Sequence, residues 1–191
     1  MSRRRFLSWA VAALVGGWSR PAAPAGGART GREQEVKLAY LYNLARFARW
    51  PRDDPPTAGT FRFGIWGDDP FGPLWNELIG RVVHGRPVEV VRVRTARDAR
   101  ACRVVFLAGA TVPAVGRMLE ALDGWPVLTV SDQPGFVDRG GMVGFVRRGE
   151  KIRFEVNLGR VRAAGLRISA EVLRLALRVV GQEGAGRGSL P

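Results

Sequence analysis

Residues 128–158 of this chain, LTVSDQPGFVDRGGMVGFVRRGEKIRFEVNL, decide its fold. A short apolar run, residues 126–130, leads into this segment and predicts a buried strand that ends at Ser131. A loop follows, and residues 142–146 return as a second strand. From 151 to 158 apolar residues alternate strictly with polar ones, and the apolar set is Ile152, Phe154, Val156 and Leu158. This alternation predicts an antiparallel hairpin that buries one face.

Strand and helix patterns alternate upstream of this hairpin with short links between them. The predicted strands are 61–66, 88–93, 104–107 and 127–130, and the predicted helices are 34–50, 72–79, 96–102 and 113–122. Pro51 is expected to end the first helix after Trp50. Such alternation predicts an α/β fold with a mixed, largely parallel sheet and helices on both faces.

A last helix is expected after the hairpin, from Ser169 as its N-cap to Gly181. Four apolar residues would form its buried stripe, namely Val172, Leu173, Ala176 and Val180. We therefore expect one α/β domain over residues 29–181, followed by a flexible tail over 182–191.

The N-terminus has the layout of an export signal. Residues 1–28 combine a basic start, an apolar stretch of about ten residues and a small-residue end, so we expect cleavage and a periplasmic mature protein. The segment SRRRFL at residues 2–7 resembles the twin-arginine motif, and an ordinary signal rich in arginine is the alternative. The apolar stretch is too short for a membrane span, which needs about 20 residues.

Composition and motifs argue against several classes of function. The 191 residues carry a formal net charge of +13, which favours acidic partners. The arginines are scattered, and no helix-turn-helix, zinc-finger or aromatic RNA-binding signature accompanies them, so we expect no nucleic-acid binding. The chain has one histidine, His84 in an expected turn, and no nucleophile elbow, phosphate loop or metal-ligand spacing. We therefore predict a protein without catalytic activity, metal or cofactor.

Cys102 is the only cysteine, so the chain has no internal disulfide. It directly precedes a predicted core strand. We expect a buried thiol, with an intermolecular disulfide as the alternative.

Two sets of polar residues are candidate binding groups. Asp68, Asp69, Ser131 and Asp132 follow predicted strands, and in an open α/β sheet ligands bind at the carboxyl ends of strands. They are expected to orient a small polar ligand, although Asp and Ser also cap helices and turns locally. Arg153 is expected on the polar face of the hairpin, and Arg147 and Arg148 are expected in its turn, where all three would meet acidic groups of a partner protein. The alternative is a charged edge that prevents aggregation.

Several motifs together resemble the YfiR-like family of small bacterial periplasmic proteins. They are VKLAYLYNLARFARWP, FRFGIWGDDPFG, VLTVSD, GGMVGF, KIRFEVNL and AAGLRISAEVLRLA, and with the segments between them they cover about residues 33–180. The resemblance implies a non-catalytic regulator that binds and represses the periplasmic domain of a membrane-bound diguanylate cyclase. Repression would lower cyclic di-GMP and biofilm formation.

The same resemblance implies a homodimer. Relatives commonly carry further cysteines, which this chain lacks, so redox behaviour of the family is not expected here. The alternative function is a periplasmic small-molecule sensor that acts on another membrane signalling protein, such as a sensor kinase.

Overall fold

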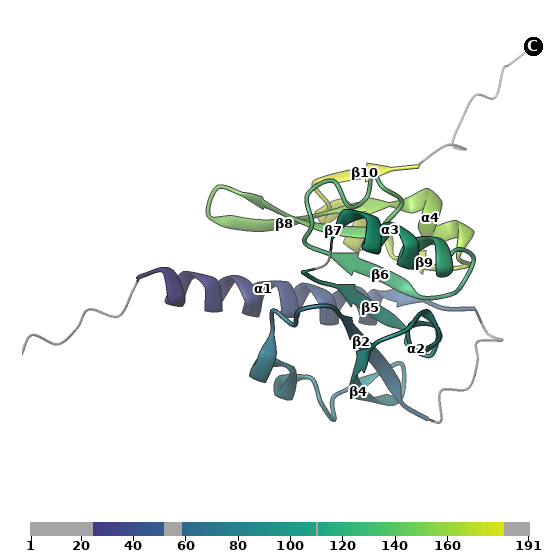
Figure 1. Ribbon diagram of the computed structural model, residues 1–191, viewed down its shortest axis with the longest axis horizontal. Helices are drawn as coiled ribbons and strands as arrows, with labels where there is room; N and C mark the ends of the chain where they lie inside the picture. The colour runs from purple at the N-terminus through teal and green to yellow at the C-terminus, as the bar shows by residue number, and fades with distance from the viewer. Residues whose placement is uncertain (1–24, 52–58, 110, 182–191) are drawn as a thin grey trace, which may run out of the picture.

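The computed structural model describes residues 25–51, 59–109 and 111–181 (Figure 1). One long helix runs beside a curled sheet, and a hairpin extends from the sheet in the same direction as that helix. The elements are α1 (Ala25–Phe47), β1 (Ala48–Arg49), β2 (Phe61–Trp66), the 3-10 helix η1 (Gly72–Glu77), β3 (Val82–Val83), β4 (Arg86–Val93), α2 (Ala96–Arg100), β5 (Val104–Leu107), α3 (Val112–Ala121), β6 (Leu128–Ser131), β7 (Val143–Arg148), β8 (Lys151–Asn157), α4 (Leu158–Ala163), β9 (Arg167–Ile168), α5 (Ala170–Leu175) and β10 (Arg178–Val180).

The main sheet confirms the predicted mixed α/β class. Its strand order is β10-β8-β7-β6-β5-β2-β4-β3. The five strands from β7 to β4 are mutually parallel. β8 returns antiparallel to β7, β10 adds in parallel to β8, and β3 pairs antiparallel with β4. β1 and β9 form a separate antiparallel pair.

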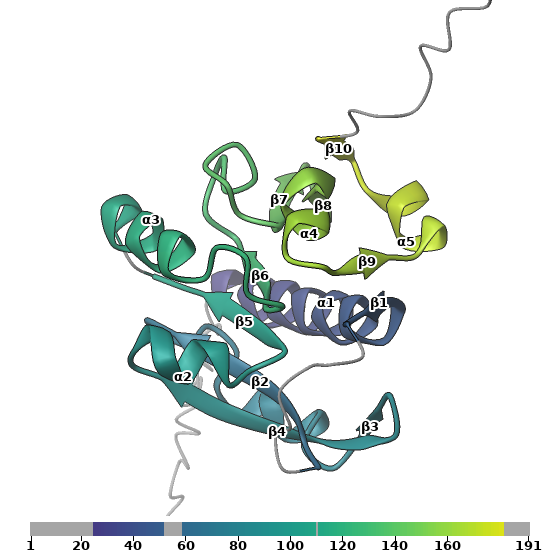
Figure 2. The ribbon, with the colours of Figure 1, turned by 90° about the vertical axis from the view of Figure 1, so that its right-hand side faces the viewer.

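Apolar side chains of the central strands alternate between two cores, one on each face of the sheet. Phe106 points into the larger core with α1, whereas Val105 points into the smaller one with α2 and α3. Figure 2 shows α2 and α3 on the opposite side of the strands from α1. In the smaller core a Cβ on Gly64 would lie 2.6 Å from Val93 Cγ2. Glycine at this position therefore leaves room for the side chains of Val93 and Cys102.

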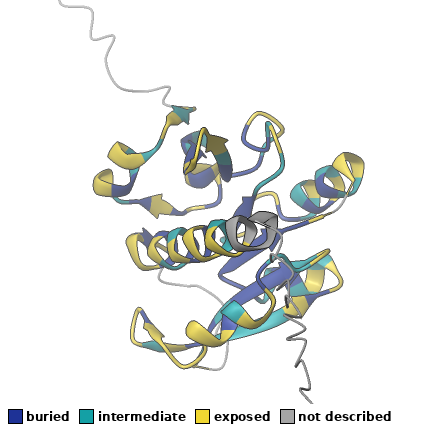
Figure 3. Ribbon diagram, turned by 90° about the vertical axis from the view of Figure 1, so that its left-hand side faces the viewer, coloured by how far each residue is buried: buried dark blue, intermediate teal, exposed yellow. Residues whose placement is uncertain are grey.

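The buried face of α1 differs from the predicted one. The sequence predicts a buried apolar stripe at Val36, Ala39, Tyr40, Leu44 and Phe47, but most of this stripe is exposed, and Val36 and Phe47 are each 38% exposed. Of that stripe only Leu44 is buried, and the helix otherwise buries Leu38, Leu41 and Ala45. It also ends at Phe47 rather than at Trp50, because Ala48 and Arg49 pair with β9. In Figure 3 the outer side of α1 is exposed wherever its burial is described, and the central strands are buried.

The predicted last helix is too long. α5 ends at Leu175, and Ala176 adopts an extended backbone with φ −65° and ψ 140°. Arg178–Val180 then form β10, which pairs with β8. Pairing at the sheet edge satisfies backbone groups of β8 that a continued helix would leave open.

The hairpin itself is confirmed. β7 and β8 pair from Val143↔Val156 to Arg148↔Lys151 without a register break. Phe154 is 2% exposed and Arg153 is exposed, as the alternation predicts. One helix after the hairpin was not predicted, namely α4, whose N-cap Asn157 accepts a hydrogen bond from Arg160 N at 3.0 Å.

The predicted export signal and tail fall largely outside the described residues. Only its last residues, from Ala25, are described, and they begin α1. Within the described ranges, no helix is long and apolar enough to cross a membrane. The tail at 182–191 lies entirely outside them.

Candidate functional site

A charged network links α1 to two parts of the segment that decides the fold, the loop after β6 and the end of β7. Lys37 is 5% exposed and donates from Nζ to Glu33 Oε1 at 2.7 Å and to Asp132 Oδ2 at 2.9 Å. Glu33 Oε2 in turn accepts from Arg147 Nη1 on β7 at 3.3 Å. We call Glu33, Lys37, Asp132 and Arg147 the Lys37 network. It joins the loop after β6 to the hairpin through one turn of α1.

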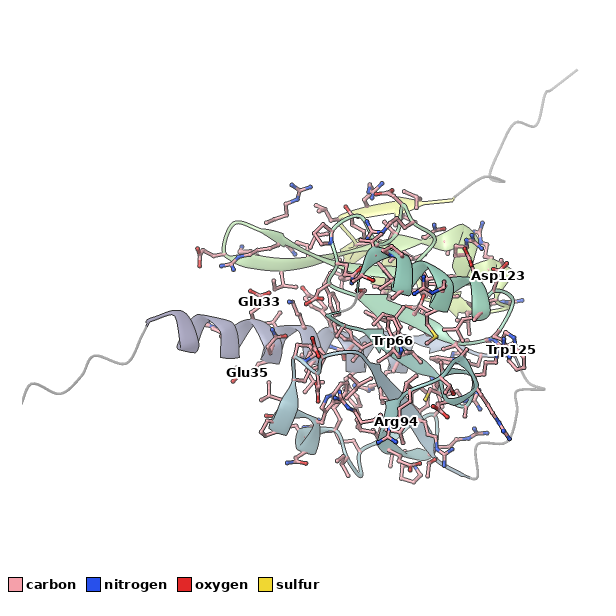
Figure 4. All side chains as sticks on the ribbon, in the orientation of Figure 1. Glu33, Glu35, Trp66, Arg94, Asp123 and Trp125 are labelled. Carbon is pink, nitrogen blue, oxygen red and sulfur yellow. The ribbon has the colours of Figure 1, made fainter. Side chains whose placement is uncertain are left out.

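Electrostatics keep the centre of this network charged. Burial alone lowers the pKa of the Lys37 ammonium, but its hydrogen bonds to Glu33 and Asp132 outweigh burial and raise that pKa above its usual value. Figure 4 shows Glu33 on the side of α1 that faces the hairpin and Glu35 on the opposite side. Glu33 is therefore placed to contact Lys37 and the hairpin together.

The predicted ligand-binding residues lie at the carboxyl ends of β2 and β6, which flank β5, and protein groups occupy several of their polar atoms. Asp69 Oδ1 accepts from Phe71 N at 2.9 Å and from Trp75 Nε1 at 3.0 Å, so it caps the start of η1. Asp68 packs against Gly109, where an added Cβ would lie 2.8 Å from the aspartate side chain. These contacts are the kind expected if the aspartates cap local turns and helices. A ligand role for Asp68 and Asp69 stays a prediction.

The other two strand-end residues lie after β6. Ser131 is fully buried, and its hydroxyl donates to Leu107 O at 2.6 Å and accepts from Gln133 N at 3.2 Å. Asp132 belongs to the Lys37 network. A ligand at Asp132 would compete with Lys37 for the same carboxylate, and this role also stays a prediction.

The structure separates the three hairpin arginines between two faces. Arg147 pairs across the hairpin with Ile152 and shares the face that packs on α1. Arg148 pairs with Lys151, on the opposite face. Arg153 pairs with Val146 and lies on that opposite face too. Arg153 therefore lies on the polar face as predicted. Arg147 and Arg148, which were expected in the turn, instead end β7, and Arg147 turns toward α1 because side chains alternate along a strand.

A cleft of about 600 Å³ lies between α1 and the hairpin. Its apolar lining comes from Val36 and Tyr40 of α1 and from Ile152 of β8. Charged residues form the rest of the lining, namely Arg32, Glu33, Arg147, Glu150, Lys151 and Arg153. We call this the α1–hairpin cleft. Four of these six charged residues are basic, so the cleft suits an acidic partner.

Arg178 makes the contacts that hold β10 to the body, and the sequence pattern gave no sign of them. Its two terminal nitrogens donate to Asp138 Oδ1 and Oδ2 at 2.9 Å each, and Nη2 donates to Glu155 Oε2 at 2.8 Å. The helix expected here would have turned Arg178 toward water. The hydrogen bonds from Arg178 hold the pKa of Asp138 below its usual value. Residues this far apart in sequence meet only in the fold.

Cys102 and His84 have the environments expected of them. Cys102 is 3% exposed, and burial raises the pKa of its thiol to about 12, so it has little thiolate character at neutral pH. His84 is exposed in the turn before Gly85, and its Nε2 donates to Ala45 O at 3.0 Å. Across residues 25–51, 59–109 and 111–181, no three His, Cys, Asp or Glu side chains are grouped to hold a metal ion.

Comparison with known proteins gives one family match. The family model described as YfiR/HmsC-like matches residues 34–177, from within α1 to two residues past the end of α5. Two solved structures are also similar, an ABC domain in complex with L-Trp from Streptococcus pneumonia and a conserved domain protein from Vibrio cholerae. Their sequence identities are 10% and 12%, and both TM-scores are 0.48. The matches cover 78% and 76% of this chain, which spans 60% of either structure.

Proposed function

Because the chain belongs to the YfiR/HmsC-like family, we propose that it is a periplasmic regulator that binds and represses a membrane-bound diguanylate cyclase. It acts without catalysis, through contact with the periplasmic domain of the cyclase, and lowers cyclic di-GMP and biofilm formation. The family match over residues 34–177 carries this proposal, because it spans the sheet and the helices that support the hairpin.

The charge of the hairpin supports a role in binding. Two of the hairpin arginines, Arg147 and Arg153, line the α1–hairpin cleft, and Arg148 lies beside them on the outer face of the hairpin. The chain as a whole carries a formal net charge of +13. Opposite charges across an interface speed encounter and select the partner. We assign these three arginines to the contact with the cyclase, and we propose that the protein binds as a homodimer.

A charge reversal at the hairpin tests this surface. Arg147→Glu with Arg148→Glu is expected to weaken binding to the purified periplasmic domain of the cyclase by about tenfold or more, measured by calorimetric titration. The melting temperature is expected to change little, because the Arg147 side chain is 54% exposed and exposed ion pairs contribute little stability. Wild-type affinity is expected to fall as salt rises.

A matched control reverses two exposed arginines on the far side of the molecule. Arg94→Glu with Arg97→Glu changes the net charge equally, and Figure 4 places Arg94 well away from Glu33. It is expected to bind like the wild type at moderate salt. Equal binding by both double variants would show that the interface lies elsewhere, and absence of binding by the wild type would contradict the proposed function itself.

A further inference from the structure

β8 has a free edge beside the α1–hairpin cleft. Among the described residues its outer side pairs only with β10, and that pairing covers Glu155–Asn157. One further bond, from Leu177 N to Phe154 O at 2.8 Å, closes the end of this pairing. The first half of β8, from Lys151 to Arg153, therefore presents an open strand edge. Unpaired edges recruit other strands unless they are covered or charged.

The direction of the backbone groups on this edge follows from the register. Asn157 N donates to Met142 O on the β7 side at 2.8 Å. Successive residues of an antiparallel strand direct their backbone groups to alternate sides, so Ile152 and Phe154 direct theirs away from β7. The bond from Leu177 to the Phe154 carbonyl agrees with this. Ile152 thus offers both its N–H and its C=O at the open edge, and Phe154 offers its N–H.

The surroundings of the edge define what it accepts. The cleft is lined by three consecutive β8 residues, Lys151, Ile152 and Arg153, so it lies along the strand rather than at its tip. Val36 is 38% exposed and, with Tyr40, gives the cleft an apolar wall. The basic residues exceed the acidic ones by four to two, that is, by +2. Apolar side chains of an added strand would enter the cleft, and acidic side chains would meet the basic rim.

We propose that the open edge of β8 and the α1–hairpin cleft bind an extended, acidic segment of the partner protein by strand addition. The strand-addition site is inferred from the structure alone. Only the identification of the partner as the cyclase rests on the proposed function. A second copy of this chain fits less well, because its own β8 edge carries Lys151 and Arg153 and like charges would face each other. Backbone pairing at Ile152 supplies direction and register, and the cleft selects alternating acidic and apolar side chains.

A synthetic peptide tests the edge without the cyclase. The probe is acetyl-EVEVEVE-amide, and the control is acetyl-KVKVKVK-amide. In NMR titrations of the full protein at low salt, the acidic peptide is expected to bind at least tenfold more tightly than the basic one. Hydrogen exchange of the Ile152 and Phe154 amides is expected to slow at least tenfold on binding. Binding of neither peptide, or unchanged exchange at these two amides, would overturn the proposal.

Two variants at one position separate backbone pairing from side-chain loss. Ile152→Pro removes the outward N–H without breaking a bond to β7, and proline is tolerated on edge strands. Ile152→Ala removes the same side chain and keeps the N–H. The proline variant is expected to bind the acidic peptide at least tenfold more weakly than the alanine variant, and equal binding would overturn the proposal. If the proline variant does not fold, the exchange measurement on the wild type decides.

The two proposals fail independently. Should the cyclase domain bind while the acidic peptide does not, the regulator stands and the strand-addition site is wrong. Should the peptide bind at Ile152 while the cyclase domain does not, the site stands and its partner is another protein with an acidic extended segment.

Discussion

At the scale of single residues, Lys37 ties α1 to the loop after β6. Its ammonium is nearly buried between Glu33, one helical turn away, and Asp132, which lies 95 positions from Lys37 along the chain. A buried charge is stable only when it is paired and hydrogen-bonded. Loss of the ammonium would remove the ion pair of Asp132 with Lys37 and would leave Glu33 with Arg147 as its counter-ion.

Lys37→Met is expected to lower the free energy of unfolding by about 1–3 kcal/mol, less than for a fully buried pair because both carboxylates are partly exposed. Urea denaturation at pH 7 measures the loss. Lys151→Met, at the only other lysine, is the control and is expected to change stability by less than about 0.5 kcal/mol. Equal losses in the two variants would show that the Lys37 network contributes no more than a surface charge.

The pH dependence of this difference follows from the raised pKa of Lys37. A group whose pKa is higher in the folded state stabilises the fold fully below its unfolded pKa, near 10.5, and loses that effect as the pH rises through the folded value. The stability difference between wild type and Lys37→Met is therefore expected to stay constant from pH 7 to 9 and to shrink above about pH 10.5. A difference that grows with alkaline pH would contradict this.

At the scale of elements, the hairpin rests on one buried face. Phe154 packs edge-on against Tyr40 of α1, with ring centroids 5.4 Å apart, whereas Arg153 points outward. Phe154→Ala is expected to cost about 3–5 kcal/mol and Arg153→Ala less than about 1 kcal/mol. Urea melts of both variants measure this, and equal losses would mean that both faces of the hairpin are covered.

The attachment of β10 depends on Arg178. Arg178→Ala is expected to lower the melting temperature and to speed amide exchange at Val179, whereas Arg174→Ala on α5, an exposed arginine, is expected to do neither. Arg178 lowers the pKa of Asp138, so this contribution is present above the ordinary value of 3.8 and is lost as the pH falls through the lower folded value. The difference in melting temperature should accordingly be largest at neutral pH. Unchanged exchange at Val179 would show that strand pairing alone holds β10.

The elements also show what sequence patterns determine. The hairpin was predictable because strict alternation over residues 151–158 has no competing period. The face of α1 was not, because Val36 and Tyr40 form one apolar stripe and Leu38 and Leu41 form another, and only packing against the sheet selects between them. Residues 178–180 were predicted as helix because the sequence does not show that the β8 edge lies beside them.

The same limit applies to the candidate site. The Asp and Ser residues at strand ends were identifiable because turn chemistry is local. Their partners were not, since Lys37 precedes Asp132 by 95 positions and only the fold joins them. The α1–hairpin cleft could not be predicted either, because it depends on which face of α1 is exposed.

At the scale of the whole molecule, the sheet is covered on both faces, and α1 and the β7–β8 hairpin extend beyond it. α1 and the β7–β8 hairpin project together, and the α1–hairpin cleft lies between them. A binding protein needs such a rigid, exposed element supported by a packed core. The proposed regulator therefore uses its core to hold the cleft and its charge to attract the partner.

The level of cyclic di-GMP in cells that lack this protein tests the central claim most directly. Deletion of its gene, in cells that express the cyclase it represses, is expected to raise cyclic di-GMP severalfold, and wild-type protein supplied to the periplasm is expected to restore the lower level. The variant with Arg147→Glu and Arg148→Glu is expected not to restore it. An unchanged level after deletion would contradict repression and would favour a small-molecule sensor that acts on another membrane signalling protein.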